Sequence, residues 1–494
     1  MLYSTNYFYN NIYVLESIVN NYRQYHNTWD EMFTKEGSIR ELYSEFGSYL
    51  ESVPIENLNK MQEFSKQFFM NQGVTFTVYN NKKGVERIFP FDIIPRIIKE
   101  KEWKIIKSGI KQRIKALNFF LKDIYHEQFI IKDGLIPANL IASHPNYIRE
   151  MRNVNVPKNI YTHISGVDLI RDKDGEFYVL EDNLRTPSGV SYMLENREIT
   201  RRLYPKLMPK KKVLTIDNYP QLLYDQLKTL VSIDNPEIVL LTPGLYNSAY
   251  YEHSTLARLM GVELVEGSDL VLKNHNVFMK TAGGLKKVDV IYRRIDDDYL
   301  DPLSFNTDSV LGLAGIMEAY RQGNVVIVNA PGTGVADDKA VYTYIPSIIR
   351  YYLNEDPILK NIKTFQLSNT DEKNYVIKNI DQMVVKKTDG SGGYGMLMGK
   401  SASKREIKDY IKKIDLKPEN FIAQPTLSLS TSPCIINNEL TPRCVDLRPF
   451  AVFGANGISV CPGGLSRVAL KKGSLVVNSS QGGGSKDTWV IKDD

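Results

Sequence analysis

The chain has 494 residues, enough for roughly two to four domains with a sizeable buried core. Hydrophobic residues make up 43% and charged residues 24% of it, which excludes a wholly disordered, collagen-like or membrane-embedded chain. The 62 lysines and arginines against 57 aspartates and glutamates leave a net charge of +5, too small for a dedicated nucleic-acid binder. Three cysteines without a C-x-x-C pair indicate neither a disulfide framework nor a thiolate zinc site. With no export signal and no long apolar run, we expect a cytoplasmic protein without a membrane span.

Patterns of apolar residues divide the chain into four regions. Near the N-terminus, Ile39, Leu42, Phe46 and Leu50 recur at helical spacing and predict a separate helical layer. The expected regions are a helical part at residues 1–75, a first part with a hairpin at 76–211, an open α/β sheet at 212–334, and an α+β part with hairpins at 335–494.

Residues 212–334 alternate between strand and helix patterns. Gly261 closes a helix predicted at residues 248–260, and a second helix is predicted at 311–321. Apolar runs predict strands at 237–241, 262–265, 288–292 and 324–328. This alternation favours an open parallel sheet.

A hairpin predicted between residues 164 and 183 carries the first candidate site. If Asp174 and Gly175 form a two-residue turn, Asp168 lies opposite Glu181, and Asn183 shares their face. Two opposed carboxylates repel unless cations lie between them, and oxygen donors without Cys or His point to Mg²⁺. The alternative is a half-exposed hairpin with solvated acids, and a longer loop would shift the register. The opposite, apolar face would carry Val167, Leu169, Tyr178 and Leu180.

A second candidate site is a glycine-rich loop after a strand predicted at residues 383–387. Gly390, Gly392 and Gly395 match G-x-G-x-x-G, but a return strand at 396–398 follows where a dinucleotide fold needs a helix. A glycine hairpin folded over phosphates, with a strand lysine before it, is the preferred hypothesis. The alternative is a flexible surface hairpin.

Arginines near the C-terminus form the third candidate site. Asp446 and Arg448 share one face of a predicted strand, and Arg467 follows; an arginine fork suits phosphate or carboxylate, although a surface ion pair is the alternative. The glycine-rich run at residues 478–489 has the composition of a lid or of a disordered tail. No H-E-x-x-H or G-x-S-x-G motif is present, and the histidines show no ligand spacing.

Many motifs in one order resemble a single family over about residues 75–491: the circularly permuted ATP-grasp proteins of type 2, distant relatives of glutathionylspermidine synthase. The motifs are Gly166-Val-Asp-Leu, Glu181-Asp-Asn, Thr186-Pro-Ser-Gly, Tyr292-Arg-Arg, Asp338-Lys-Ala, residues 389–395, Ala423-Gln-Pro, Asp446-Leu-Arg-Pro, Gly463-Gly-Leu-Ser-Arg and residues 478–489. The resemblance implies a circularly permuted ATP-grasp fold. Together with the apolar patterns above, the expected class is mixed α/β and α+β, with an added parallel α/β subdomain and an N-terminal helical region that lies outside the resemblance.

The resemblance also implies the roles of individual residues. Asp168, Glu181 and Asn183 would bind Mg²⁺; Lys339, Lys386, Gln424 and the loop Gly390, Ser391, Gly392, Gly393, Tyr394 and Gly395 would bind ATP; Arg448 and Arg467 would stabilise the transferring phosphoryl group; and Arg185, Ser188 and Ser191 would face the acyl substrate, with Arg185 also catalytic. Whether Lys386 or Lys387 reaches phosphate stays open, with Lys386 preferred. Removal of residues 1–75 is expected to leave ATP binding intact.

The function implied is an ATP- and Mg²⁺-dependent ligase that phosphorylates a carboxylate to an acylphosphate, lets an amine attack it, and releases ADP and phosphate. The alternative is a non-catalytic ATP-grasp scaffold that binds nucleotide or peptide. By family analogy, the partners would be an alpha-E protein and a transglutaminase-like protein in a peptide-modification system. Nucleic acid and membrane are not expected as partners.

Overall fold

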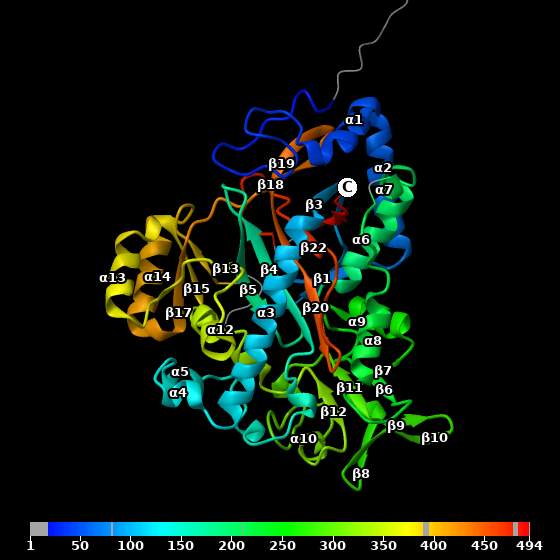
Figure 1. The fold of residues 1–494 in the computed structure, drawn as a ribbon, viewed down its shortest axis with the longest axis vertical. Helices are drawn as coiled ribbons and strands as arrows, with labels where there is room; N and C mark the ends of the chain where they lie inside the picture. The colour runs from blue at the N-terminus through cyan, green and yellow to red at the C-terminus, as the bar shows by residue number, and fades with distance from the viewer. Residues whose placement is uncertain (1–17, 81–82, 211, 389–394, 478–482, 494) are drawn as a thin grey trace, which may run out of the picture.

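A ten-stranded, mainly antiparallel sheet draws strands from almost the whole length of the chain (Figure 1). The computed structural model describes residues 18–80, 83–210, 212–388, 395–477 and 483–493. The strands of this sheet are β3 (Phe91–Lys99), β4 (Ile164–Arg171), β5 (Phe177–Asn183), β13 (Lys360–Asn361), β18 (Thr431–Ile436), β19 (Glu439–Arg448), β20 (Phe450–Gly454), β21 (Gly457–Val460), β22 (Leu465–Val468) and β23 (Gly484–Ile491). Their order is β13-β5-β4-β19-β22-β23-β3, with β18 beside β19, β20 beside β4, and β21 beside β20.

The hairpin predicted from the sequence is formed by β4 and β5, and Asp168 pairs with Glu181 as expected. The turn, however, is longer than two residues, because Asp172 accepts hydrogen bonds from the backbone amides of residues 174 and 176. Arg171 therefore pairs with Phe177, and a bulge after Asp168 restores the predicted pairing. The register at the candidate site is confirmed, although the assumed turn was wrong.

The bulge changes which side chains face the core. Val167, Leu169 and Val179 are fully buried in the main hydrophobic cluster. Tyr178 and Leu180 are only partly buried and pack into a different cluster, with Ile170. The predicted apolar face was therefore right for β4 and wrong for β5.

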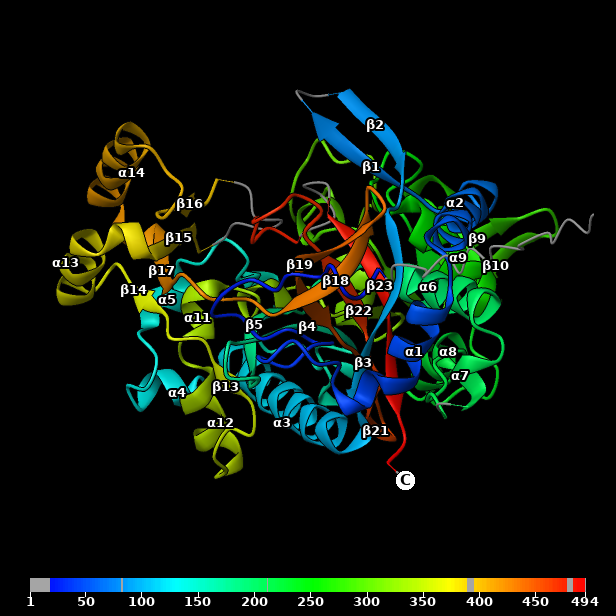
Figure 2. The same ribbon diagram turned by 90° about the horizontal axis from the view of Figure 1, so that it is seen from above.

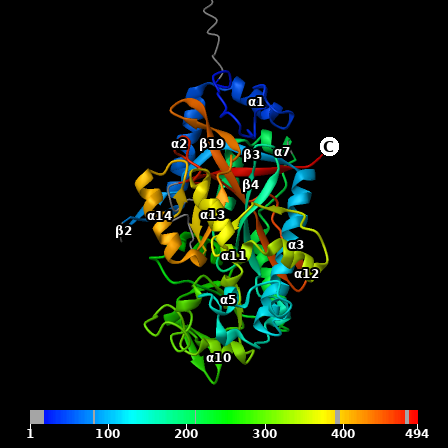
Figure 3. The same ribbon diagram turned by 90° about the vertical axis from the view of Figure 1, so that its left-hand side faces the viewer.

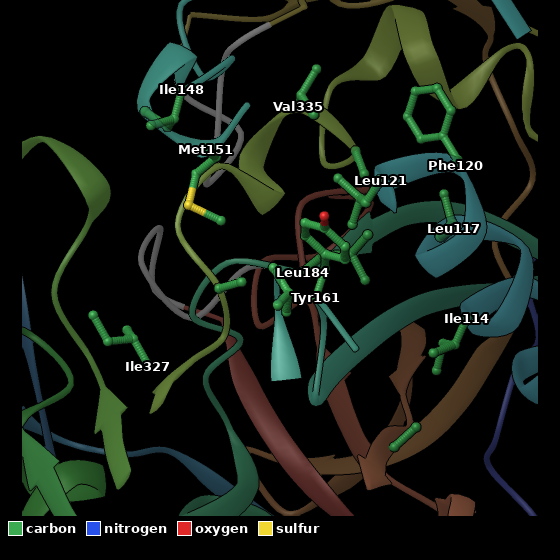
Figure 4. Packing of buried hydrophobic residues seen from close by; sticks show 14 of the residues in the cluster. Ile114, Leu117, Phe120, Leu121, Ile148, Met151, Tyr161, Leu184, Ile327 and Val335 are labelled. Carbon is green, nitrogen blue, oxygen red and sulfur yellow. The ribbon is translucent and has the colours of Figure 1, made fainter. Parts of the chain in front are cut away.

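The helix α3 (Glu100–Tyr125) packs against this sheet and anchors the hairpin. Figure 4 shows Ile114, Leu117, Phe120 and Leu121 of α3 in the same cluster as Tyr161 and Leu184. On β5, Asp182 accepts two hydrogen bonds from Arg113 of α3, at 2.6 and 2.8 Å. This buried ion pair fixes the strand between the two predicted ligands Glu181 and Asn183.

The open parallel sheet predicted for residues 212–334 is confirmed. Its order is β12-β11-β6-β7 and all three pairings are parallel. The elements are β6 (Ile238–Leu241), α9 (Tyr250–Met260), β7 (Glu263–Val265), β11 (Val290–Arg293), α10 (Ile316–Arg321) and β12 (Val326–Val328), preceded by α6 (Val190–Leu203), α7 (Leu207–Lys210) and α8 (Tyr219–Lys228). Gly261 ends α9 at a φ of 69°, a conformation that favours glycine. A small antiparallel sheet of β8 (Leu270–Lys273), β9 (Asn276–Thr281) and β10 (Gly284–Lys287) projects beside it (Figure 1).

Residues 365–425 form a small lobe to one side of the central sheet in Figure 1, and the lobe faces the viewer in Figure 3. Its sheet has the order β14-β17-β15-β16 and is antiparallel. The lobe contains β14 (Phe365–Gln366), α13 (Thr370–Lys378), β15 (Met383–Lys387), β16 (Leu397–Met398), α14 (Lys404–Leu416) and β17 (Phe421–Pro425), and follows α11 (Lys339–Tyr342) and α12 (Ile345–Leu353). The strands from β18 to β23 belong to the central sheet instead, so the last 160 or so residues do not form one unit.

The N-terminal segment shares a core with the rest of the protein. Phe46 and Leu50 of α1 (Ser44–Ser52) pack in one cluster with Ile94 and Trp489. The helix α2 (Ile55–Asn71) lies beside β3, and the hairpin of β1 (Thr75–Asn80) and β2 (Lys83–Ile88) projects from the body (Figure 2). The expectation of a removable layer is not supported, because its removal would expose this core.

The buried carboxylate of Glu31 ties the N-terminal segment to the central sheet. It accepts hydrogen bonds from Arg96 at 2.5 Å and from Arg171 at 2.9 Å. Burial alone would raise the pKa of Glu31, but the two guanidinium groups outweigh it and lower the pKa. Arg96 also donates to the backbone oxygen of Asp446, so this contact reaches the candidate site.

We expect Glu31→Gln to lower the free energy of unfolding by about 3 kcal/mol, because it leaves the charge of fully buried Arg96 without its counter-ion. Urea unfolding would measure the loss. The exposed Glu41→Gln is the matched control, for which we expect a change within about 0.5 kcal/mol. Equal midpoints for the two variants would contradict the role of Glu31.

Two further sequence expectations can be compared with the described residues. Cys434, Cys444 and Cys461 are buried and unpaired, as expected from their spacing. Within the described ranges, no helix is long and apolar enough to cross a membrane.

Candidate functional site

A pocket lies between the small lobe and the central sheet. One part of its wall is apolar, and the other part carries the predicted lysines, Glu181 and Arg467. The lining comprises Leu180, Glu181, Lys339, Val384, Lys386, Lys387, Met396, Met398, Gln424, Pro425, Leu427, Leu429, Asp446, Arg467, Leu475, Val476 and Val477. The pocket therefore offers an apolar surface for a planar ring and a charged surface for an anion.

The small lobe contributes Lys386 and Gln424 from neighbouring strands. Lys386 Nζ donates to Gln424 Oε1 at 2.9 Å, and Gln424 Nε2 donates to Thr364 Oγ1 at 3.0 Å. Burial lowers the pKa of Lys386 to about 8, aided by the charge of Lys339 and opposed by Glu181 and Asp168. Lys387 is more exposed, which favours Lys386 as the pocket lysine.

Lys339 approaches the hairpin of β4 and β5 from α11. Its ammonium group lies 3.8 Å from the Glu181 carboxylate. Asp338 caps α11 by accepting from the amides of residues 340 and 341, and Lys339 donates its own amide to the Thr388 oxygen at 3.3 Å. These contacts place α11 next to the end of β15, where the glycine loop begins.

Two arginines and two carboxylates form a cluster that includes Asp446 and Arg467 of the pocket wall. Arg448 donates hydrogen bonds to Asp168 from Nε at 2.5 Å and from Nη2 at 2.7 Å. Arg467 donates to the same carboxylate from Nη2 at 2.6 Å. Arg467 also donates from Nε to both oxygens of Asp446, at 2.9 and 3.1 Å. Burial alone would raise the pKa of Asp168, but Arg448 and Arg467 outweigh it and hold the pKa below its ordinary range. The Asp446 to Arg448 pair considered from the sequence is thus replaced by pairs between strands.

The hairpin residues fit a magnesium ion that is completed by phosphate oxygens. Glu181 and Asn183 are half-buried, and Asn183 Nδ2 donates to the Gly166 oxygen at 3.1 Å, which holds its amide in place. Within the described residues, no group of three or more His, Cys, Asp or Glu side chains forms a metal site by itself. Mg²⁺ commonly binds through one or two carboxylates together with substrate phosphates, so this donor set suits it.

The loop after β5 holds the predicted substrate residues in different surroundings. Arg185 Nε donates to Asp337 at 2.8 Å and stays partly exposed, and burial raises the pKa of Asp337 to about 6 despite this arginine. Ser188 Oγ accepts from Arg294 at 2.6 Å, and its backbone oxygen accepts from Arg448 at 3.2 Å. Ser188 is thus next to a predicted catalytic residue.

Ser191 is fully buried at the start of α6. Its amide donates to the Glu252 carboxylate at 3.2 Å and its hydroxyl contacts the Glu252 backbone oxygen. It supports the loop and does not line the pocket.

Gly390, Ser391, Gly392, Gly393 and Tyr394 lie outside the described residues. Gly395 follows them with a φ of 69°. The described strands on each side, β15 and β16, pair with each other, which confirms the return strand predicted after the loop.

Sequence reasoning missed Asn329, which follows β12 of the open sheet and forms hydrogen bonds to the hairpin of β4 and β5. Its Oδ1 accepts from the amides of His163 and Ile164 at 2.7 and 2.9 Å, and its Nδ2 donates to the oxygens of Leu184 and Arg185 at 2.8 and 3.0 Å. Arg294 was seen only as part of a motif; it bridges Ser188 and Glu252. An asparagine at a strand end carries no pattern from which this role could be predicted.

Comparisons with known proteins find relatives that match 94% of this chain. An uncharacterized protein of Synechocystis sp. is 49% identical over 468 residues, covering 94% of this chain and 97% of that protein. An uncharacterized protein of Mycobacterium tuberculosis is 49% identical over 471 residues, covering 94% and 84%. A candidate glutamate–cysteine ligase of Frankia alni is 38% identical over 465 residues, covering 94% of this chain and 54% of that protein.

The fold is also similar to a solved structure, a glutathione synthetase-like effector of Globodera pallida in its apo form. The TM-score is 0.57 at 11% identity, over 89% of this chain and 98% of that chain, a likeness in fold alone. The family model of circularly permuted ATP-grasp type 2 proteins matches residues 95–469. The chain therefore belongs to the circularly permuted ATP-grasp family of type 2, as its motifs predicted.

Proposed function

We propose that the protein is an ATP- and Mg²⁺-dependent carboxylate–amine ligase that works through an acylphosphate. The observation that carries the proposal is the pocket, in which an apolar wall suits adenine while Lys339, Lys386 and Arg467 suit phosphates. Family membership supports ATP as the nucleotide. The candidate glutamate–cysteine ligase among the relatives is named for the same class of reaction, the joining of a carboxylate to an amine.

The proposed reaction activates a carboxylate that would otherwise be inert toward amines. A carboxylate oxygen attacks the γ-phosphorus, and the bond from that phosphorus to the β,γ-bridging oxygen breaks, releasing ADP. The amine then attacks the acyl carbon, loses a proton, and expels phosphate together with one former carboxylate oxygen. No covalent bond to the protein is required, which agrees with the lack of nucleophile motifs in the sequence.

The residues of the pocket act by binding and positioning. Lys339 and Lys386 bind phosphate oxygens, Gln424 contacts the adenine edge, and the role proposed for residues 390–395 is to bind the triphosphate. Arg448 and Arg467 stabilise charge on the transferring phosphoryl group. Arg185 and Ser188 face the acyl group, while buried Ser191 supports their loop through Glu252.

Asp168, Glu181 and Asn183 would hold the metal. When bound, Mg²⁺ would neutralise charge on the outer phosphates. The chain's own contribution is to hold these three oxygen-bearing side chains in the register fixed by the hairpin and by the Arg113 to Asp182 pair.

The products test the proposal. A screen of carboxylates with hydroxylamine as the amine should reveal ATP turnover that yields ADP and inorganic phosphate in equal amounts. Asn183→Ala, which removes a metal ligand without a change of charge, should abolish it. AMP and pyrophosphate as products would contradict the acylphosphate mechanism, and ATP binding without turnover in any mixture would favour the scaffold.

Lys386 predicts a pH dependence of ATP binding. Its pKa of about 8 means that the ammonium loses its proton as the pH rises through 8, whereas bound phosphate raises the pKa. ATP affinity should therefore fall by up to about tenfold per pH unit above pH 8, with uptake of a proton on binding. Calorimetry in buffers of different ionisation enthalpy would measure that proton.

The two lysine variants separate the possible sources of this pH dependence. Lys386→Met should remove the proton uptake and weaken binding at pH 7. Lys387→Met should keep the uptake, because Lys387 is the more exposed of the two. Proton uptake that survives in Lys386→Met would assign the titration to another group.

The location, substrate class and partner proteins are proposed by analogy with the family. We propose that the protein acts in the cytoplasm on a peptide or small-molecule carboxylate, beside an alpha-E protein and a transglutaminase-like protein. Co-purification of the tagged protein with either partner would test this.

A further inference from the structure

The carboxylate of Asp168 binds two arginines in the structure and would bind a metal ion in the proposed function. Asp168 is fully buried and accepts three N–H groups, two from Arg448 and one from Arg467. A carboxylate offers about four lone-pair positions, so three are already used. In the proposed function, the same carboxylate is also a ligand of Mg²⁺.

A divalent cation and two guanidinium groups cannot share these oxygens without cost. Each is a positive group in a poorly solvated position, where like charges repel strongly. One lone-pair position stays open, but a metal ion there would lie beside two guanidinium groups, so we expect its binding to be favoured when Asp168 gives up one guanidinium contact. Metal binding and the position of an arginine are therefore linked through Asp168.

The remaining contacts show which arginine is released. Arg467 keeps Asp446, to which it donates from Nε at 2.9 and 3.1 Å. Apart from Asp168, the hydrogen-bond partner of Arg448 among the described residues is the Ser188 backbone oxygen, at 3.2 Å. Arg448 is also the more exposed of the two side chains, at 13% against 6%. Arg467 is thus held in either arrangement, and Arg448 is held mainly by Asp168.

We propose that Asp168 exchanges Arg448 for the metal ion and so frees the Arg448 guanidinium to bind the phosphates of ATP. The inference rests on the proposed function and adds an order of events, in which metal binding precedes the contact of Arg448 with ATP. Without metal, Asp168 neutralises Arg448 and keeps it from the nucleotide. The coupling is reciprocal, so loss of the Asp168 charge should strengthen metal-free ATP binding, and loss of Arg448 should strengthen metal binding.

The first test measures ATP affinity by calorimetry in EDTA and in excess Mg²⁺. Wild type should bind ATP weakly in EDTA and at least tenfold more tightly with Mg²⁺. Asp168→Asn should bind ATP in EDTA about tenfold more tightly than wild type and gain little from Mg²⁺. Asn183→Ala should also gain little from Mg²⁺, without the gain in EDTA expected for Asp168→Asn, because the Asn183 amide bonds the Gly166 oxygen and not an arginine.

A double-mutant cycle separates exchange from a general change of charge. Glu181→Gln removes a different carboxylate, which lines the pocket and lies 3.8 Å from the ammonium group of Lys339. The gain in EDTA from Asp168→Asn should vanish in an Arg448→Gln background, whereas any gain from Glu181→Gln should persist there. Asp168→Asn with wild-type affinity in EDTA, or a gain that survives without Arg448, would overturn the exchange.

A second test avoids the buried Asp168 substitution, which could cost folding. Arg448→Gln should bind Mn²⁺ alone at least threefold more tightly than wild type, measured by electron paramagnetic resonance of free Mn²⁺. Lys386→Gln removes a nearby charge that does not touch Asp168 and should change Mn²⁺ affinity less. Equal effects of the two variants would overturn the exchange. Failure of wild type to bind ATP in either buffer would instead refute the proposed function and this inference together.

Discussion

Arg448→Lys is expected to lower the rate of ADP formation by roughly 10² to 10³-fold, because lysine replaces a two-pronged guanidinium with a point charge. In the structure, Arg448 uses Nε and Nη2 on Asp168 and Nη1 on the Ser188 oxygen, and one ammonium group cannot reproduce these three directions. The total charge of the pocket is unchanged, so ATP affinity with Mg²⁺ should fall much less than the rate.

The measurement is ADP release at saturating ATP, with the carboxylate and hydroxylamine mixture found by the screen. Arg350→Lys is the matched control, since Arg350 forms an exposed ion pair with Asp356 and does not line the pocket. That variant should keep the wild-type rate. A wild-type rate for Arg448→Lys would remove Arg448 from the chemical step, whatever the rate of the control.

Glu181→Gln is expected to remove the effect of Mg²⁺ on ATP affinity and to lower turnover by at least about 10²-fold, since an amide is a much weaker metal ligand than a carboxylate. Glu181 lines the pocket, is half-buried and lies 3.8 Å from its ion-pair partner Lys339, so the substitution removes little from the stability of the fold. The fold should remain intact, with an unfolding midpoint close to that of wild type.

Glu176→Gln is the control on the same hairpin, because Glu176 lies in the exposed turn between β4 and β5. It should leave both the Mg²⁺ effect and the rate unchanged. If Glu181→Gln retained the full Mg²⁺ effect, Glu181 would be excluded as a ligand. If it lost cooperative unfolding, the carboxylate would have a structural role in the hairpin.

The site hairpin shows why sequence reasoning succeeded in one respect and failed in another. The pairing of Asp168 with Glu181 was predicted correctly although the assumed two-residue turn was wrong, because the bulge after Asp168 offsets the longer turn. The bulge itself could not be predicted, because a bulge depends on how both strands pack against layers from distant parts of the chain. The same error placed Tyr178 and Leu180 on the core face.

Long-range burial explains the other differences. Residues 484–489 belong to the glycine-rich run described as a lid or tail, yet they form most of β23. There Lys486 is fully buried and donates to Asp92 and to the oxygens of Ile94 and Pro433. Helical spacing in α1 was legible, but the partners of its apolar face, such as Trp489, lie more than 400 residues away. Local patterns predict elements, while the contacts between distant segments decide layers.

The motif residues that the pocket gathers were predictable because their chemical type is constrained. Lys386 and Gln424 lie on adjacent strands and form a hydrogen bond. Lys339 forms an ion pair with Glu181 from α11, whose position beside the hairpin could not be predicted from the sequence. Asn329 and Asp337 support the same loop but share their residue types with many surface positions. Their roles become visible only when the hydrogen bonds are known.

The most direct test of the central claim follows one oxygen atom. With a substrate carboxylate labelled by ¹⁸O, transfer through an acylphosphate predicts that each inorganic phosphate released carries one ¹⁸O atom, and that one amide forms for each ADP. Mass spectrometry of the phosphate measures this. Phosphate without label, alongside amide formation, would contradict the account, because the carboxylate oxygen would then never have been joined to the γ-phosphorus.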